Sequence, residues 1–222
     1  MQVDKKYYQV IPKKSIGEKL TVYARDKIYS DFVSKCSPSA SSKILDFGVS
    51  DVLGDAANVL ERKYPYPENI TAVGLGDGKE FREEFSSMTY VQIIPNARLP
   101  FEDKSFDVVL SNAVLEHVGS PANQRYFIQE AARVGKQVFL TVPNKFFPIE
   151  HHTSIPFLHW FPHTFKFVCN AVNKSQWADD DHLILISRSY LESLIPAGLN
   201  YRIFYTGINL GPFSSNICLH IY

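Results

Sequence analysis

Residues 43–48, Lys43-Ile-Leu-Asp-Phe-Gly48, form a short apolar run that ends in an acid and a glycine. A run of this length bounded by turn residues is typical of a buried β-strand. Four similar runs follow, at intervals that leave room for helices between them: 70–75, 90–94, 106–111 and 137–142. Strands that alternate with helices predict a doubly wound, mostly parallel sheet with helices on both faces.

The segments around these strands carry helix signals. The clearest is at 120–133, where Ser120 can cap the helix, Pro121 takes the first helical position and Gly135 stops it. By apolar spacing and capping residues we also expect helices over 15–34, 55–63, 79–87 and 187–197.

The last two predicted strands decide the topology. They cover 201–208 and 216–222 and are separated by a turn at 211–215. Such a turn is too short for a parallel crossover, so the two strands must pair antiparallel. We therefore expect an α/β, Rossmann-like sheet of seven strands, mostly parallel, that ends in an antiparallel hairpin. The whole chain, 1–222, is expected to be a single domain.

The composition excludes several classes of protein. The chain has 222 residues, 45% hydrophobic and 21% charged, which excludes disorder for most of it. Its 23 basic and 23 acidic residues balance, which argues against nucleic-acid binding. We expect no signal peptide or membrane span, since the start is polar and no apolar window reaches about 18 residues. Three scattered cysteines fit reduced thiols in a cytoplasmic protein: Cys36, Cys169 and Cys218.

The end of the first strand is the expected ligand site. In open α/β sheets, ligands bind beyond the carboxyl ends of the strands at the switch point, next to the first strand. Asp46 could accept a hydrogen bond from an ammonium group there, and Gly48 would let the backbone turn closely around a ligand. An ordinary strand-to-helix turn is the alternative interpretation.

The glycine-rich stretch Gly74-Leu-Gly-Asp-Gly78 looks like a nucleotide-binding loop. Too few residues separate it from the strand at Phe106 for it to follow the first strand, so we assign it to the second. Asp77 could then reach a ribose hydroxyl pair, as acids after the second strand do in this class of fold. A solvated turn residue is an equal alternative.

Residues 96–118 carry a resemblance to a known family. They read Asn96-Ala-Arg-Leu-Pro-Phe-Glu-Asp-Lys-Ser-Phe-Asp-Val-Val-Leu-Ser-Asn-Ala-Val-Leu-Glu-His-Val118. This run resembles the class I S-adenosylmethionine-dependent methyltransferases, closest to the type 11 or UbiE-like group that acts on small molecules. The resemblance covers 43–142 well and 185–222 loosely. It implies S-adenosylmethionine as cofactor, S-adenosylhomocysteine as product and a small-molecule acceptor.

The resemblance also assigns cofactor contacts. It places Asp46 and Gly48 at the methionine end, the 76–77 pair by the ribose, the 96–97 pair by the adenine and the 111–112 pair near the sulfonium. The candidate cofactor-binding residues are Asp46, Phe47, Gly48, Val49, Gly76, Asp77, Asn96, Ala97, Ser111 and Asn112.

Three departures from the family pattern suggest an alternative. The usual Asp/Glu-x-Gly-x-Gly-x-Gly motif reads Asp46-Phe-Gly-Val-Ser-Asp-Val52, so two glycines are missing. The acid usual after strand two falls on Gly76, and the Asp usual at the adenine is Asn96, whose carbonyl oxygen can still accept a hydrogen bond. The alternative is a cofactor-binding but non-catalytic regulatory or interaction protein that kept the fold. A nucleotide-dependent oxidoreductase is disfavoured by the terminal hairpin and by the 96–118 run.

Two segments should reach the methyl acceptor, one after the fourth strand and one after the fifth. Methyl transfer from a sulfonium needs mainly positioning, with a general base only for a poorly ionised acceptor. The candidate catalytic residues are His117, Glu150 and His152, because carboxylates and imidazoles suit proton abstraction. Packing or capping is the alternative for His117. For Glu150 and His152 the alternatives are hydrogen bonds within the loop or a metal site. We expect no metal, because cysteine partners are missing.

Aromatic residues make up 14% of the chain and cluster between 146 and 177. They fall in an insert, about 143–185, where the resembled enzymes carry a variable substrate cover. The insert could be a lid, a homodimer surface or a membrane-surface contact, and its lack of a basic face favours the first two. The run at 143–153 resembles bacterial relatives associated with modification of surface glycans and other small molecules, so the acceptor is expected to be an oxygen or nitrogen of such a compound.

Overall fold

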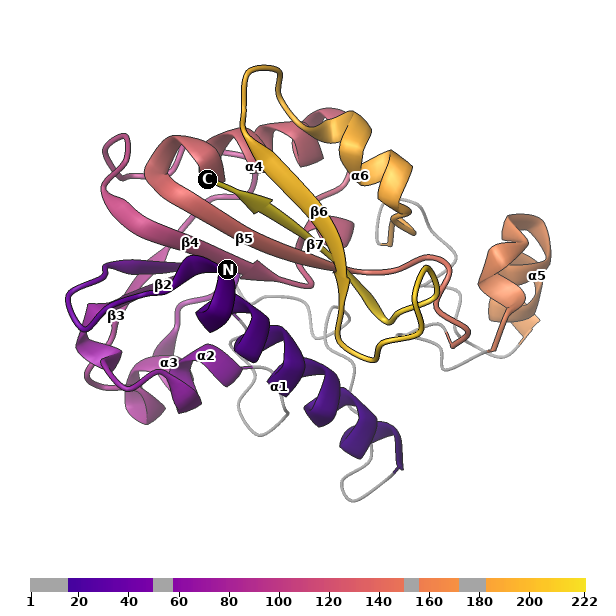
Figure 1. Ribbon diagram of the computed structural model, residues 1–222, viewed down its shortest axis with the longest axis horizontal. Helices are drawn as coiled ribbons and strands as arrows, with labels where there is room; N and C mark the ends of the chain where they lie inside the picture. Colours follow the sequence, from indigo (N-terminus) through magenta and orange to yellow (C-terminus); the bar gives the residue numbers. More distant parts are fainter. Residues whose placement is uncertain (1–15, 50–57, 150–155, 172–182) are drawn as a thin grey trace.

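The protein is described by a computed structural model in which residues 16–49, 58–149, 156–171 and 183–222 are defined (Figure 1). Its centre is a seven-stranded sheet in the order β3-β2-β1-β4-β5-β7-β6. The strands are β1 (Ile44–Phe47), β2 (Ile70–Gly74), β3 (Thr89–Gln92), β4 (Phe106–Asn112), β5 (Gly135–Pro143), β6 (Tyr201–Thr206) and β7 (Asn216–Ile221). The first five are parallel, and β7 runs antiparallel to both β5 and β6. The predicted fold class is confirmed.

Helices cover both faces of this sheet (Figure 1). On one face lie α1 (Ile16–Cys36), α2 (Val59–Lys63) and α3 (Lys79–Glu84), and on the other lie α4 (Pro121–Val134) and α6 (Arg188–Leu194). Short 3-10 turns are η2 (Pro67–Asn69), η3 (Leu115–His117) and η4 (Leu158–Trp160). Helix α5 (Pro162–Ala171) lies apart from the sheet, on the side toward which β5 runs.

Two hydrophobic clusters form the core, one on each face of the sheet. Side chains alternate between the faces along a strand. In β1, Leu45 and Phe47 therefore join the cluster of α4 and α6, whereas Ile44 joins the cluster of α1, α2 and α3. By the same alternation Asp46 points to the face of Ile44, on which α2 packs.

The predicted helix boundaries hold where a side chain fixes them. Ser120 caps α4 by accepting a hydrogen bond from Asn123 N, and Ser187 caps α6 in the same way from Tyr190 N. Helix α6 ends at Leu194 instead of the predicted 197, because Ile195 precedes Pro196 and is extended. The start of the predicted 55–63 helix lies outside the described residues, and its described part begins at Val59.

None of the described helices combines the length and the apolar character needed to cross a membrane.

Candidate functional site

The site lies where the central strands β2, β1 and β4 end. Asp46 pairs in register with Ala72 on β2 and with Leu110 on β4. The connections leave β1 in opposite directions at this point, which is the switch point where open α/β sheets bind their ligands. The structure thus brings the predicted segments 46–49, 74–78 and 111–112 to one edge of the sheet.

A buried pair of carboxyl groups lies at this edge. Asp46 is 8% exposed and Glu61 of α2 is 5% exposed, and the two carboxyl groups lie close enough for each to affect the other. Desolvation raises the pKa of both carboxyls, and the neighbouring charge of Glu61 raises the pKa of Asp46 further.

Glu61 was not predicted from the sequence. Neither of its carboxylate oxygens accepts a hydrogen bond from another described residue. Leu60 and Tyr64, four residues apart, are both buried and show which side of α2 faces the core. Glu61 follows Leu60 directly on this short helix, and that position was the only sign in the sequence that its carboxyl could be buried.

The other residues at the end of β1 serve the fold. Gly48 has φ +100°, and a Cβ there would lie 2.6 Å from Cγ2 of Val114, so only glycine fits. The ring of Phe47 stacks on Phe127 with centroids 3.9 Å apart. Val49 is also buried, in the opposite cluster. The side chains of Phe47 and Val49 thus belong to the core, and only their backbone can line a ligand site.

The end of β4 is tied to its two neighbours. The Ser111 hydroxyl donates to the carbonyl oxygen of Phe47 at 2.8 Å, and Thr141 Oγ1 donates to Asn112 Oδ1 at 2.5 Å. Ser111 is almost fully buried. Its hydroxyl therefore joins β4 to β1, and the predicted contact near the sulfonium stays a prediction.

The glycine-rich turn after β2 is shaped by Tyr90. A Cβ at Gly74 would lie 2.5 Å from Tyr90 Oη, and a Cβ at Gly78 would overlap the same ring. The Tyr90 hydroxyl donates to Gly76 O at 3.0 Å. Asp77 is exposed, and its Oδ1 accepts from Lys79 N at 3.0 Å, so it supports the start of α3. The glycines make room for a tyrosine, and the ribose contact of Asp77 stays a prediction.

The predicted adenine segment follows β3 at the same edge. Ile93 N donates to Gly74 O at 2.9 Å, which extends the pairing of β2 with β3 toward this segment. Asn96 is exposed and has φ +57°, and Ala97 is exposed beside it. Asn tolerates this left-handed conformation better than most residues.

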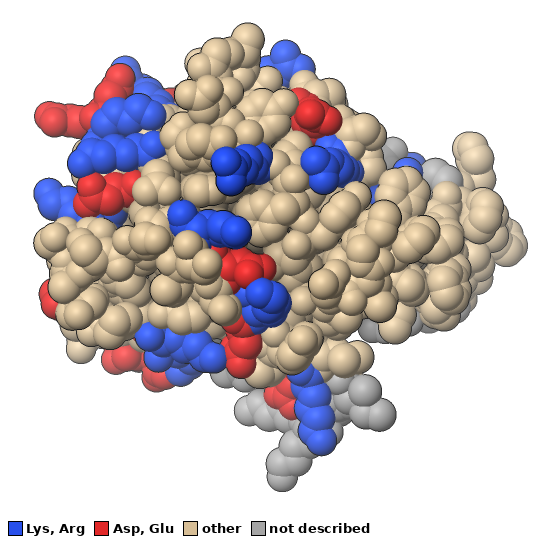
Figure 2. Space-filling model, in the orientation of Figure 1, with Lys and Arg blue, Asp and Glu red and all other residues tan. Residues whose placement is uncertain are grey.

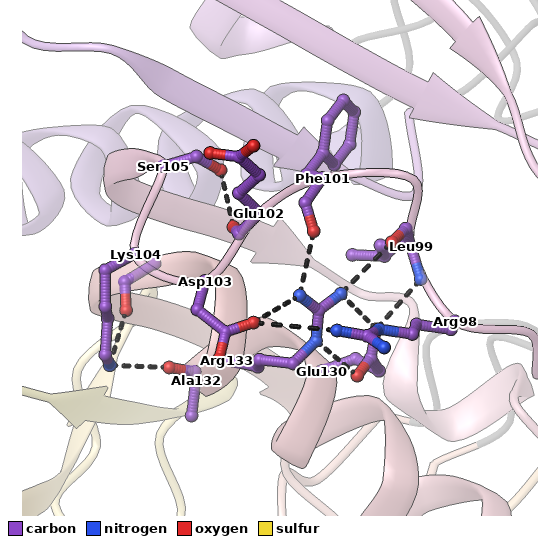
Figure 3. A network of polar contacts seen from close by, with 11 residues as sticks. Arg98, Leu99, Phe101, Glu102, Asp103, Lys104, Ser105, Glu130, Ala132 and Arg133 are labelled. Carbon is purple, nitrogen blue, oxygen red and sulfur yellow. Dashed lines mark hydrogen bonds and ion pairs between the residues drawn. The ribbon is translucent and has the colours of Figure 1, made fainter.

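Two side chains of α4 hold the motif that carries the resemblance (Figure 3). Glu130 accepts from Leu99 N at 2.8 Å, and Arg133 donates to Leu99 O at 3.1 Å and to Phe101 O at 2.8 Å. Arg133 also pairs with Glu130 and Asp103, each at 2.8 Å, and its hydrogen bonds lower the pKa of Glu130. These contacts fix the loop that begins at the adenine segment. Sequence reasoning missed both residues, because they lie about 30 positions further along the chain.

The candidate catalytic residues are described only in part. His117 is half-buried on η3, and its Nε2 lies 4.0 Å from Oε1 of the buried Glu116. Glu150 and His152 lie outside the described residues. On either side of them Ile149 and Pro156 pair as an isolated bridge, and Phe157 N donates to Pro148 O at 2.7 Å.

The aromatic insert is anchored to the loop between β6 and β7. Asn144 Nδ2 donates to Pro212 O at 2.9 Å and to Ser214 O at 2.8 Å, which ties the end of β5 to this loop. Trp160 stacks on Phe213 of the same loop, with centroids 5.9 Å apart. Beyond this contact the insert exposes large rings, with Phe167 74% exposed. On the face shown in Figure 2, charged side chains are sparse around this insert.

Comparisons with known proteins agree with this architecture. The family model described as "Methyltransferase domain" matches residues 54–138. The fold is similar to the PH0226 protein from Pyrococcus horikoshii, with a TM-score of 0.62, 14% identity and 99% of both chains covered. It is similar to an S-adenosylmethionine-dependent methyltransferase from Aquifex aeolicus, with a TM-score of 0.53, 12% identity and 94% and 98% of the two chains covered.

A third similar structure is an S-adenosylmethionine-dependent methyltransferase from Thermotoga maritima, with a TM-score of 0.54, 14% identity and 92% and 93% of the two chains covered. No sequence among the curated proteins matches. At these identities the structures show the fold, and together with the domain match they confirm the resemblance to class I methyltransferases.

Proposed function

We propose that this protein transfers a methyl group from S-adenosylmethionine to an oxygen or nitrogen of a small-molecule acceptor. The observation that carries the proposal is the buried carboxyl group of Asp46 at the switch point of a sheet with the methyltransferase strand order. A buried carboxylate at this place suits the ammonium group of a methionine moiety. It would repel a pyrophosphate, which argues against a dinucleotide-dependent oxidoreductase.

The residues at the site fit this cofactor. Asp46 would accept hydrogen bonds from the ammonium group, and the carbonyl oxygen of Asn96 would accept one from the adenine amino group. Asp77 would bind the ribose, and Asn112 would border the sulfonium. The cofactor supplies an activated methyl group, so the chain mainly has to orient it toward the acceptor.

The aromatic insert is our candidate for the cover of the acceptor. It follows β5, whose carboxyl end lies beside the candidate cofactor site, and its exposed rings offer an apolar surface that can exclude water. His117, Glu150 and His152 are the candidate bases for a hydroxyl acceptor. We propose a precursor of a surface glycan or a similar small metabolite as acceptor, and a cytoplasmic location that fits the three free, buried thiols.

Calorimetric titration with S-adenosylmethionine and S-adenosylhomocysteine tests the proposal. We expect saturable one-to-one binding of both, with dissociation constants well below about 1 mM, which corresponds to only about 4 kcal/mol of binding free energy. No binding of either compound at millimolar concentration would overturn the assignment of the cofactor.

A second candidate is a regulatory protein that kept the fold. It is favoured by the side chains of Ser111 and Asp77, which already make hydrogen bonds within the protein. Replacement of Ser50 and Val52 by glycine separates the two candidates. A methyltransferase should transfer methyl groups faster at a subsaturating cofactor concentration when the glycine motif is restored, whereas a non-catalytic protein should show no change in any activity.

A further inference from the structure

The position of Glu61 makes it part of the candidate cofactor site. Asp46 points to the face of the sheet on which α2 packs, and on this face α2 places the buried Glu61 carboxyl, whose charge acts on Asp46 and whose two oxygens have no hydrogen-bond partner among the described residues. Both groups lie at the carboxyl end of the central strand β1, and both are more than nine-tenths buried.

The pair has no cation of its own among the described residues. Arg62 is the basic residue whose charge acts on Glu61, and its guanidinium is paired with Glu84 of α3 at 3.1 Å. Lys63, the next residue, is paired with Asp26 of α1 at 2.6 Å. Both basic residues of α2 are thus directed to acids on neighbouring helices. Buried carboxylates normally have a donor or a cation as partner, and neither Glu61 oxygen has one among the described residues, so the pair calls for one.

We propose that Asp46 and Glu61 together bind the ammonium group of the cofactor's methionine moiety, and that they release their shared proton when it binds. The inference rests on the proposed function and adds Glu61 to the binding residues. In the free protein one proton bridges the two carboxyl groups. On binding, both carboxylates are ionised, the ammonium group keeps its three protons as donors, and the displaced proton leaves to solvent.

Proton release makes cofactor binding depend on pH. Desolvation and mutual repulsion favour the protonated pair in the free protein, and the charge of Arg62, which acts on Glu61, does not remove that preference. Binding should therefore strengthen about tenfold per pH unit while one proton is displaced. The increase should end at the pH where the pair is ionised in the free protein as well, because no proton is then displaced.

The test is calorimetric titration with S-adenosylhomocysteine, which has the same amino-acid moiety and no reactive methyl group. Titrations at pH 6.5 in phosphate and in imidazole, whose ionisation enthalpies differ, give the number of protons released. We expect about one proton for the natural chain. Glu61→Gln should release almost none and should bind with an affinity that changes little between pH 5.5 and 6.5.

A matched control is Glu83→Gln on α3, which makes the same chemical change at an exposed position away from the site. It should behave as the natural chain does, and thermal melting should show that each variant is folded. Binding without proton release by the natural chain would overturn the inference and leave the proposed function standing. Equal proton release by Glu61→Gln would also overturn it. Absence of any binding would overturn both. The number of protons that the natural chain releases on binding tests the inference even if Glu61→Gln does not fold.

Discussion

Asp46 is the residue on which the site depends most. It is enclosed at the end of β1, and the charge of another buried acid, Glu61, acts on it. Such an arrangement destabilises the folded chain at neutral pH, since a buried charge is costly without a counter-charge. A residue kept at a cost in stability at the switch point of the sheet is more easily explained by a ligand than by packing.

Asp46→Asn should therefore weaken cofactor binding without harming the fold. Hydrogen bonds to a charged group contribute about 1.5–3 kcal/mol, so we expect S-adenosylhomocysteine to bind about 10- to 100-fold more weakly. Calorimetry measures the affinity. Asp26→Asn is the control, because its exposed ion pair with Lys63 lies away from the site and should leave binding unchanged. An unaltered affinity of Asp46→Asn would mean that the ammonium group lies elsewhere.

The same pair predicts how stability changes with pH. Burial raises the pKa values of Asp46 and Glu61 in the folded chain above their unfolded values of 3.8 and 4.5. The stabilisation that the two protonated groups give the folded chain is therefore fully present below those values and is lost as the pH rises through the folded pKa.

In Glu61→Gln, most of this fall in stability with rising pH should be absent. The variant should be more stable than the natural chain at pH 8, by about 1–4 kcal/mol, and the difference should shrink toward pH 4. Urea unfolding of both chains across this range measures it. A difference that grows as the pH falls would contradict the shared-proton interpretation.

At the scale of elements, the loop before β4 shows what the sequence motif is for. Its backbone is held by Glu130 and Arg133 of α4, so one helix fixes the loop that connects the adenine segment to β4 (Figure 3). The resemblance in this loop therefore reflects its attachment to α4 as well as its place beside the cofactor.

Arg133→Met should loosen this loop. The side chain is 15% exposed and bonds two part-buried carbonyl oxygens, the buried Glu130 and the exposed Asp103, so its loss leaves the buried Glu130 carboxylate without its counter-charge. We expect a loss of about 3–5 kcal/mol in the free energy of unfolding, as for other broken buried pairs. Arg98→Met is the matched control, because Arg98 is 70% exposed and lies 3.8 Å from the same Asp103. Chemical denaturation should show a change below about 0.5 kcal/mol for it.

The sequence predicted those features that depend on residues close together in the chain, and it missed those that depend on contacts between distant residues. The strands, the hairpin and the cap at Ser120 rest on neighbouring residues and were predicted correctly. The glycines around Gly76 were not explained by the sequence, because Tyr90, which needs the space, is on another strand. Glu61 was missed for the same reason, since only the packing of α2 brings it to Asp46.

At the scale of the whole molecule, the chain divides into a sheet domain and a small aromatic insert. The sheet domain has a core on each face, built from α1, α2 and α3 on one side and α4 and α6 on the other. The described part of the insert packs its own buried residues, such as Phe165, and contacts the domain through Trp160. An element attached in this way can open without unfolding the domain.

Trp160→Ala tests this division. Its indole stacks on Phe213 and packs edge-on against Phe146 and Phe157, so the substitution should detach the insert. We expect faster limited proteolysis within 156–171, a melting temperature lowered by no more than about 2–4 °C, and an unchanged affinity for S-adenosylhomocysteine, because the cofactor site belongs to the sheet. Phe167→Ala, which removes an exposed ring of the same insert, should leave proteolysis unchanged. A large fall in the melting temperature of Trp160→Ala would instead show that the insert is part of the domain core, and a cover that has to open for the acceptor could not then be built from it.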